Sequence, residues 1–430
     1  MDFNKLYPLT ATQILALFKQ NTITVEYYAR SLLHHPELVL SQARALDKIP
    51  QDERGPLHGV GIAIKDVMNT KDMPTQFGSP LYKGNHSGFD SSTVSILRQA
   101  GALIFGKTTT SEFTITSFGP DTTNPHDPNR TPGGSSAGSA AAVADFQVPL
   151  SFETQTGGSI IRPAFFTGIF AMKPTYNAIS PEGQKTCTAT IDSSGFFARS
   201  MEDLQLLADV LALKDDSPLE EVPLKEARVA LMKTPVWPQG GPGTIATMEK
   251  AANILRSRGV KVEGRGGNSD AQEAFLREYR MDKTKLAPEI RHLVENRCNY
   301  TRKERVQATD KYASMRTIFD DIAAKYSAII TPSVVDEAPL GLGDFGSAAF
   351  NWIWTGLHMP VVHIPAFAGD HGMPVGISVV AGRFCDQHLL MISKVLGEPL
   401  MAEGGWNLEP VYSVLSTMKL GPSFDMNSSL

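Results

Sequence analysis

Three short segments carry residue types that could perform nucleophilic chemistry on a carbonyl carbon. They are GIAIKD at residues 61–66, TPGGSSAGSAAAVAD at 131–145 and TQTGGSIIRPAFFTGIFAMKPT at 154–175. They supply a lysine after an apolar stretch, two adjacent serines in a glycine-rich loop, and a serine that follows two glycines. A serine becomes a good nucleophile only when a neighbouring base takes its proton, so the lysine is the candidate base.

Each segment by itself has two interpretations. Lys65 could be a strand-end lysine whose ammonium reaches the surface, or a desolvated lysine whose lowered pKa lets it act as a base. Residues 133–139 could form a flexible linker, but the alanine-rich helical pattern that follows favours a loop whose backbone binds an anion. Residues 156–159 could form an ordinary turn, or an oxyanion hole in which successive backbone N–H groups point at a developing negative charge.

Taken together, the three segments resemble the amidase signature family, whose members are serine hydrolases of amide bonds. The resemblance is carried by Lys65 in GIAIKD, Ser135 in GGSSAGSAAAVA and Ser159 in TQTGGSIIRPA. The two serines are 24 positions apart (159 − 135), as in the family pattern. Further matches cover nearly the whole chain, from GKTTTSEF at 106–113 to GMPVGISVVAGRFCDQHLL at 372–390.

The resemblance implies a role for each of these residues. Ser159 would attack the substrate carbonyl and form an acyl-enzyme. Ser135, held by a cis peptide bond after Gly134, would connect it to Lys65. Neutral Lys65 would accept the proton through Ser135 and later deliver it to the leaving amine. The tetrahedral oxyanion would be bound by the backbone amides of Thr156, Gly157, Gly158 and Ser159.

Residues around this predicted site carry weaker signals. Four aromatic side chains favour an apolar or aromatic acyl group in the substrate, although such side chains are as often part of a core; they are Phe113, Phe118, Trp352 and Trp354. Of these, Phe113 is the one we assign to the substrate-binding site. Arg162 and Asp192 are similar to a structural polar pair of the family, and no catalytic role is assigned to them.

The chain departs from the family pattern at three places. The common form DTGGSIRIPA is QTGGSIIRPA here, with Gln155 in place of the acid and the arginine at Arg162. Ala137 stands where a glycine usually follows the serine pair. The NPxLNAF segment that usually precedes the lysine is missing. The changed signature around Gln155 and Arg162 limits what can be inferred about the substrate. The missing NPxLNAF segment predicts an altered surface or substrate entrance.

Two other catalytic patterns are present without the context that they need. Residues 134–138 match G-x-S-x-G, the nucleophile elbow of α/β-hydrolases, with Ser136 as the nucleophile. That elbow requires a strand directly before it, whereas TNPHDPNRTPG reads as a loop. The S-x-x-K pattern at 416–419 lies in the C-terminal tail without the motifs that accompany it in penicillin-binding enzymes.

The main prediction is an amidase that converts a carboxylic amide to an acid plus ammonia or an amine, without a metal or an organic cofactor. One alternative is a glutamine-hydrolysing amidotransferase subunit of a tRNA-dependent complex, which would have the same fold and the same three residues. A second alternative is a non-catalytic scaffold relative. Retention of Lys65, Ser135 and Ser159 argues against the scaffold.

Composition restricts the partners and the compartment. The 430 residues include 40 basic and 45 acidic side chains, so the net charge is 40 − 45 = −5, with no block of like charge. We therefore expect a small-molecule amide as substrate, no nucleic-acid or membrane partner, and a homodimer as the compatible oligomer. A reducing, cytoplasmic location is predicted by the absence of a secretory leader pattern and by the distant spacing of Cys187, Cys298 and Cys385.

Helical and strand patterns alternate along the chain and predict an α/β fold. Strands are expected at 59–64, 102–106, 148–156, 228–233, 261–264, 326–334 and 374–382, and the longest helical patterns at about 270–297 and 303–325. The resemblance implies an α/β/α sandwich with a large mixed, mainly parallel central sheet covered by helices. We divide the chain into an N-terminal helical segment (1–50), a catalytic domain (51–420) and a tail (421–430).

Overall fold

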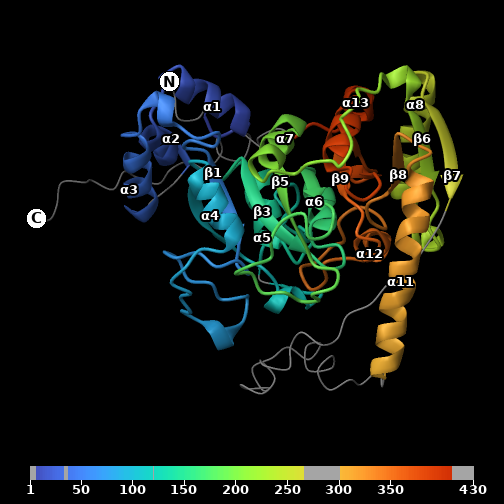
Figure 1. Cartoon of the computed structure of the whole chain (residues 1–430), viewed down its shortest axis with the longest axis horizontal. Coiled ribbons are helices and arrows are strands. Elements are labelled where there is room, and N and C mark those ends of the chain that lie inside the picture. The colour runs from blue at the N-terminus through green and yellow to red at the C-terminus, as the bar shows by residue number, and fades with distance from the viewer. Residues whose placement is uncertain (1–5, 33–36, 120, 266–300, 409–430) are drawn as a thin grey trace, which may run out of the picture.

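The computed structural model describes residues 6–32, 37–119, 121–265 and 301–408. At its centre lies a ten-stranded sheet in the order β2-β1-β3-β5-β4-β9-β10-β8-β6-β7 (Figure 1). The strands are β1 (Gly61–Lys65), β2 (Leu103–Thr108), β3 (Leu150–Gln155), β4 (Phe170–Lys173), β5 (Ser193–Ala198), β6 (Arg228–Met232), β7 (Lys261–Arg265), β8 (Ala328–Pro332), β9 (Val361–Ala368) and β10 (Pro374–Val380).

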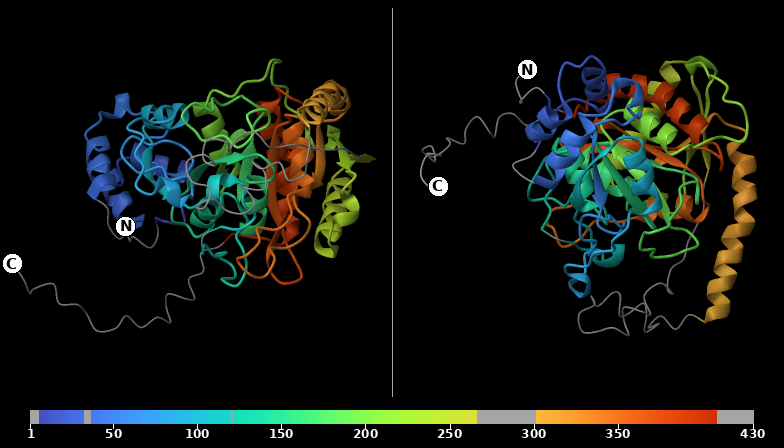
Figure 2. Two further views of the ribbon diagram at one scale, coloured as in Figure 1. Left: turned by 90° about the horizontal axis from the view of Figure 1, so that it is seen from below. Right: turned by 60° about the vertical axis from the view of Figure 1, so that its left-hand side comes forward.

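Helices cover both faces of this sheet and its ends. They are α1 (Ala11–Lys19), α2 (Val25–Leu32), α3 (Glu37–Leu46), α4 (Ser92–Gln99), α5 (Ala137–Ala144), α6 (Ile161–Thr167), α7 (Met201–Val210), α8 (Pro242–Ser257), α11 (Arg302–Ala323), α12 (Ala349–Gly356) and α13 (Asp386–Gly404). The three N-terminal helices lie at one end of the sheet and α11 lies at the other (Figure 2). The division at residue 50 stays a prediction.

Strand direction differs between the flanks and the middle of the sheet. Among the described strands, β1 pairs in parallel with β2 and β3, and β6 pairs in parallel with β7 and β8. The intervening neighbours, from β3·β5 through β10·β8, are all antiparallel. The structure confirms the α/β order and the large mixed sheet, and it confines parallel pairing to the two flanks.

The alternation of side chains along β1 and β3 determines what faces the candidate site. Ile62 and Ile64 belong to a hydrophobic core that also contains residues of α4, α7, α8 and α13. Ala63 points the other way, into a second core formed with α5, α6 and α12. Since successive strand residues alternate between faces, Lys65 projects to the side of the sheet that α5 covers.

Helix α5 lies close to the sheet because its sequence, AGSAAAVA, consists of small side chains. Nearly all of its residues are buried, and it packs against β1, β2, β3 and β5. A helix of alanines brings its backbone near the strands without large side chains in between. As a result, the serine-rich loop that precedes α5 is held over the carboxyl ends of β1 and β3.

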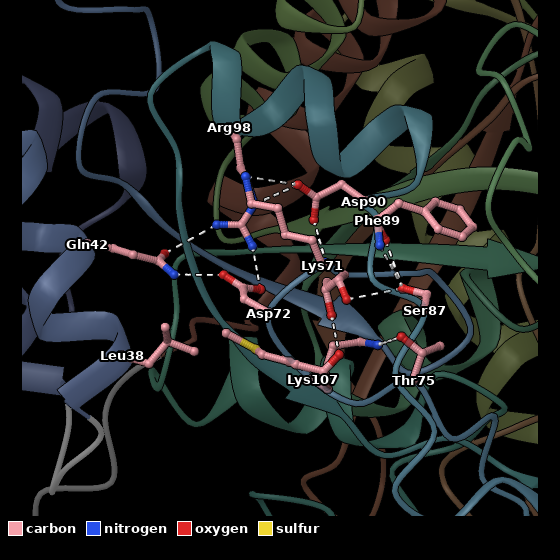
Figure 3. A network of polar contacts seen from close by, with 12 residues as sticks. Leu38, Gln42, Lys71, Asp72, Thr75, Ser87, Phe89, Asp90, Arg98 and Lys107 are labelled. Carbon is pink, nitrogen blue, oxygen red and sulfur yellow. Dashed lines mark hydrogen bonds and ion pairs between the residues drawn. The ribbon is translucent and has the colours of Figure 1, made fainter.

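The segment that follows β1 is fastened by a polar network that links α3, α4 and the 66–90 loop (Figure 3). Arg98 of α4 forms ion pairs with Asp72 at 2.7 Å and with Asp90 at 3.2 Å. Gln42 of α3 donates to Asp72 at 2.8 Å and accepts from Arg98 at 3.3 Å. These side chains are largely buried, so the loop is tied to two helices by charge-assisted contacts.

Three sequence predictions concern features that this structure addresses only in part. In the described ranges no helix is long and apolar enough to cross a membrane. The same ranges hold no group of three or more His, Cys, Asp or Glu side chains that could bind a metal. The helical pattern predicted at 270–297 and the tail predicted at 421–430 lie outside the described residues. The cytoplasmic location stays a prediction.

Candidate functional site

The amine of Lys65, the last residue of β1, lies at the centre of the candidate site. Its side chain is completely buried. The Nζ atom donates hydrogen bonds to Ser135 Oγ at 2.9 Å and to Ser136 Oγ at 2.8 Å. It also donates to the carbonyl oxygen of Thr154 at 3.2 Å and to the hydroxyl of the same residue at 3.3 Å. All these acceptors are neutral, so the amine is held without a direct ion pair.

Burial lowers the pKa of Lys65 to about 8, because the ammonium form loses its hydration inside the protein. The acidic groups of Glu153, Asp192 and Cys187 oppose this shift, and the guanidinium of Arg162 adds to it. A lysine with such a pKa is neutral far more often near neutral pH than an exposed lysine. It can therefore accept a proton, as a general base must.

Both serines of the pair reach Lys65 because the loop before α5 folds back over the strand. The peptide bond between Gly134 and Ser135 is cis, as the resemblance implied. A side chain at position 134 has no room, since a Cβ there would lie 2.3 Å from the ring of Phe345. The fold thus places the hydroxyls of Ser135 and Ser136 side by side above one amine.

Ser159 lies in the turn between β3 and α6, with 6% of its surface exposed. The hydroxyl of Ser136 donates a hydrogen bond to the carbonyl oxygen of Ser159 at 2.5 Å. Among the described contacts, no hydrogen bond joins the hydroxyls of Ser135 and Ser159. The structure therefore gathers the three predicted residues in one place and couples them through Ser136, while proton transfer through Ser135 stays a prediction.

The turn at Ser159 is fastened by Gln155, the residue that stands where the family pattern has an acid. Its Oε1 accepts hydrogen bonds from the backbone amides of Ile160 at 2.8 Å and Ile161 at 3.0 Å. Its Nε2 donates to the hydroxyl of Thr355 at 3.0 Å. A glutamine performs both tasks because its amide has an acceptor and a donor at the same end.

The backbone N–H groups of the turn are available to an oxyanion. Within the described part of the chain, the amides of Gly157, Gly158 and Ser159 donate no hydrogen bond to the protein. Both glycines are required by close packing: a Cβ at 157 would lie 2.8 Å from the ring of Trp352, and one at 158 would lie 2.9 Å from Asn351 Nδ2. Free N–H groups at the start of α6 suit a developing negative charge.

Arg162 and Asp192 both support the site, but the prediction that they form a polar pair is wrong. Asp192 accepts a hydrogen bond of 2.5 Å from the hydroxyl of Thr156. Arg162 instead donates from Nε and Nη2 to the carbonyl oxygen of Gly134, at 3.1 Å and 2.7 Å. The acid thus holds the start of the glycine turn, and the arginine holds the loop of the serine pair.

The aromatic residues proposed for substrate binding lie in different surroundings. Phe113 is fully buried, with ring centroids 6.3 Å from Phe77 and 5.9 Å from Tyr82. Trp354 is a core residue. Trp352 is half-buried and lies against the glycine turn. A substrate-binding role for Phe113 stays a prediction, and Trp352 is the aromatic residue that the structure places beside the turn.

A small cavity adjoins Trp352 on the side of α11, and sequence reasoning missed it. Thr190, Arg316 and Gly356 contribute to its lining. Arg316 is half-buried, and its Nε donates to the carbonyl oxygen of Gly356 at 3.2 Å. Among the described residues it has no carboxylate partner. The cavity has a volume of about 10 Å³, room for about one water, and neither Lys65 nor Ser159 lines it.

Two curated relatives of this chain are named as subunits of the same kind of enzyme. A glutamyl-tRNA(Gln) amidotransferase subunit from Symbiobacterium thermophilum is 32% identical over 426 aligned residues, which cover 83% of this chain and 86% of that protein. The protein of the same name from Mycobacterium avium is 37% identical over 60% of this chain and 57% of its own length.

These names correct the expectation about partners. From the sequence we expect a small-molecule amide as substrate, no nucleic-acid or membrane partner, and a homodimer as the compatible oligomer. That expectation is wrong, because the relatives are named as one subunit of an enzyme that acts on glutamyl-tRNA(Gln). The error arose because the catalytic motifs are common to free amidases and to such subunits, and because net charge says nothing about binding to another subunit.

A family model and a solved structure agree on the wider class. The model of the amidase family matches residues 15–265. A crystal structure described as an amidase superposes with a TM-score of 0.80 and 25% identity, covering 92% of this chain and all of that one. The chain therefore belongs to the amidase family, whose enzymes act on carbon–nitrogen amide bonds.

Proposed function

We propose that the chain is a glutamine-hydrolysing subunit, which releases ammonia from the side-chain amide of glutamine and supplies it to a partner subunit. The relatives named as amidotransferase subunits support this choice over a free amidase. The observation that carries the chemistry is the buried amine of Lys65, shared by the hydroxyls of Ser135 and Ser136 beside the turn that bears Ser159.

Acylation would begin with neutral Lys65. As Ser159 Oγ bonds to the amide carbon of the substrate, its proton would pass to Ser135 and the proton of Ser135 would pass to Nζ of Lys65. The carbonyl oxygen would become an oxyanion bound by the free amides of Gly157 and Gly158. Lys65 would then return the proton through Ser135 to the nitrogen, and ammonia would leave with both its electron pair and that proton.

Deacylation would follow the same path with water in place of the serine. Water would attack the acyl carbon, a proton would reach Lys65 through Ser135, and Ser159 would leave with a proton returned from the lysine. The sum of the two steps is one amide plus one water giving one carboxylic acid and one ammonia. No other reactant is needed.

We propose that Arg316, a half-buried cation near Trp352, selects glutamine over an uncharged amide. It lines the cavity beside Trp352, which itself packs on the glycine turn. The α-carboxylate of glutamine would be its natural partner, since a guanidinium binds a carboxylate through two parallel hydrogen bonds. An uncharged amide would gain nothing from this residue.

The test compares ammonia release from glutamine with release from butyramide by the wild type, R316M and K311M. Lys311 is an exposed cation on the same helix and serves as the matched control. We expect R316M to raise KM for glutamine about ten- to a hundredfold, because one charge-assisted contact is lost. The kinetic constants for butyramide should not change. Hydrolysis of butyramide but not of glutamine by the wild type would contradict the proposal and favour a free amidase.

A further inference from the structure

We infer that Glu153 is the buried counter-charge of Lys65, and that its carboxylate stabilises the ammonium that forms on Lys65 while Ser159 is acylated. Glu153 touches no reacting atom, so it is a positioning residue that acts through the lysine. The inference rests on the proposed acyl-enzyme chemistry, but it is independent of which amide is the substrate.

The sheet places the two side chains together. In the parallel pairing of β1 with β3, Ala63 is opposite Ser151 and Ile64 is opposite Phe152. Continuing this register by one residue sets Lys65 opposite Glu153. Side chains at facing positions of neighbouring strands project from the same face of a sheet, which here is the face under α5.

The carboxyl group of Glu153 has no hydrogen-bond partner of its own. The residue is fully buried, and neither side-chain oxygen has a hydrogen bond among the described residues. The hydroxyls of Ser136, Ser139 and Ser151 lie beside it and favour its ionised form without making bonds of normal geometry. A buried acid without donors is rare in proteins and costs stability, so a charged partner has to account for it.

Lys65 is the only positively charged residue that shifts the pKa of Glu153. Burial raises the pKa of the Glu153 carboxyl, and the charge of Lys65 lowers it. In the other direction, Glu153 is the largest of the influences that raise the pKa of Lys65, ahead of Asp192 and Cys187, while Arg162 acts in the opposite sense. Helix α5 and strand β5, which also pack on the pair, contribute no ionisable side chain.

Asp192 is the rival for this role, and its hydrogen bonds argue against it. Its carboxylate accepts from the hydroxyl of Thr156 and from two backbone amides, so its charge is already balanced by donors. Glu153 has only three serine hydroxyls beside it, none of them in normal hydrogen-bond geometry. The negative charge of Glu153 therefore acts mainly on the amine of Lys65.

Lys65 takes up and releases the proton during the reaction, while Glu153 supplies a fixed negative charge. The pKa of Lys65 is about 8 and that of Glu153 about 7, so in the active form, which predominates above about pH 8, Lys65 is neutral and Glu153 is ionised. When the proton of Ser159 arrives at the lysine through Ser135, the ammonium forms without a direct ion pair but within the electrostatic reach of the Glu153 carboxylate, in a buried region where screening is weak. The proton then leaves for the amine, and Glu153 neither gains nor loses a proton during the cycle.

The test is the pH dependence of Ser159 labelling by a fluorophosphonate in the wild type and in E153Q. Removing the negative charge should lower the pKa of Lys65, so the acidic limb of the labelling rate should move to lower pH by about one unit or more. The plateau at high pH should fall about tenfold, because the weaker base is a poorer proton acceptor. An unmoved limb in E153Q would overturn the inference.

D203N is the matched control, since Asp203 is another fully buried carboxyl, on α7, whose oxygens accept from the amides of Ala11 and Thr12. The D203N variant should lose stability, but the acidic limb of its labelling rate should stay at the pH of the wild type. Failure of the wild type to label at Ser159 would refute the proposed acyl-enzyme chemistry instead, so the two failures are distinguishable.

A second measurement covers the case in which E153Q does not fold. K65M leaves Glu153 without a counter-charge, so the pKa of this carboxyl in the folded state should rise further above its unfolded value. The pKa of Glu153 in the wild type is about 7, so both proteins should lose stability equally as pH rises to 7, and K65M should lose stability relative to the wild type between about pH 7 and 8, where only its Glu153 is still protonated. The double variant K65M/E153Q should abolish that loss. Parallel stability curves for K65M and the wild type would overturn the inference.

Discussion

The hydroxyl of Ser136 donates a hydrogen bond of 2.5 Å to the carbonyl oxygen of Ser159. The same hydroxyl accepts a hydrogen bond of 2.8 Å from Lys65. The second serine of the pair therefore connects the base to the backbone of the nucleophile. It also cannot serve as the nucleophile of an α/β-hydrolase elbow in this arrangement, because it is fully buried and its proton is directed at a carbonyl group.

We predict that S136A retains Ser159 as the site of labelling but lowers kcat/KM about a hundredfold, the cost of a misplaced nucleophile. S135A should lose about a thousandfold or more, because the proton path itself is interrupted. Steady-state kinetics of the two variants on one amide would show whether S135A loses more activity than S136A. A larger loss in S136A than in S135A would mean that Ser136, rather than Ser135, carries the proton.

The activity should depend on pH through Lys65. The neutral amine is the active form, and burial lowers the pKa of Lys65 to about 8. We therefore expect kcat/KM to rise about tenfold per unit as pH increases towards 8 and to level off above it. A profile measured with parallel controls for enzyme stability at each pH would test this. A flat profile below pH 8 would exclude Lys65 as the base.

Gln155 should be replaceable only by a side chain that keeps its acceptor. Q155E retains an oxygen for the amides of Ile160 and Ile161, while Q155L leaves both amides without a partner and removes one of the hydrogen bonds of the Thr355 hydroxyl. We expect Q155L to lower the free energy of unfolding by about 2–3 kcal/mol and Q155E by about half of that. Urea denaturation of both variants measures the difference, and equal losses would show that the turn does not depend on this acceptor.

The network around Arg98 should contribute to stability more than surface ion pairs do (Figure 3). Arg98 contacts two carboxylates with 16% of its side chain exposed, so R98M would remove the guanidinium from both, leaving Asp72 with Gln42 and Asp90 with Lys71. We expect a loss of about 3 kcal/mol. R30M, which breaks an exposed ion pair within α2, should change stability little. Equal effects of R98M and R30M in thermal unfolding would contradict the prediction.

The sequence allows a correct prediction wherever the feature is local. Lys65 at a strand end and the serine pair before an alanine helix follow from short motifs, the cis peptide bond after Gly134 is implied by the family resemblance, and the structure has each of them. The alternating elements likewise predict the strands at both flanks of the sheet, because helical crossovers between them leave a recognisable pattern.

Non-local features could not be predicted. Strands β4, β5 and β9, which lie with β10 in the antiparallel middle of the sheet, are not among the predicted strands, although the predicted strands β1, β3 and β10 are just as buried on both faces. Thr154 accepts hydrogen bonds from Lys65, and Glu153 comes opposite Lys65, only because of the register between β1 and β3. The error about Arg162 and Asp192 has the same origin, since which loop each side chain holds depends on how distant loops approach one another.

The most direct test of the central claim is intact-protein mass spectrometry after exposure to a fluorophosphonate, with S159A in parallel. A single adduct on the wild type, mapped by peptide analysis to Ser159 and absent from S159A, is the result that we predict. An adduct on Ser136, or an equal adduct on the wild type and S159A, would contradict the assignment of Ser159 as the nucleophile.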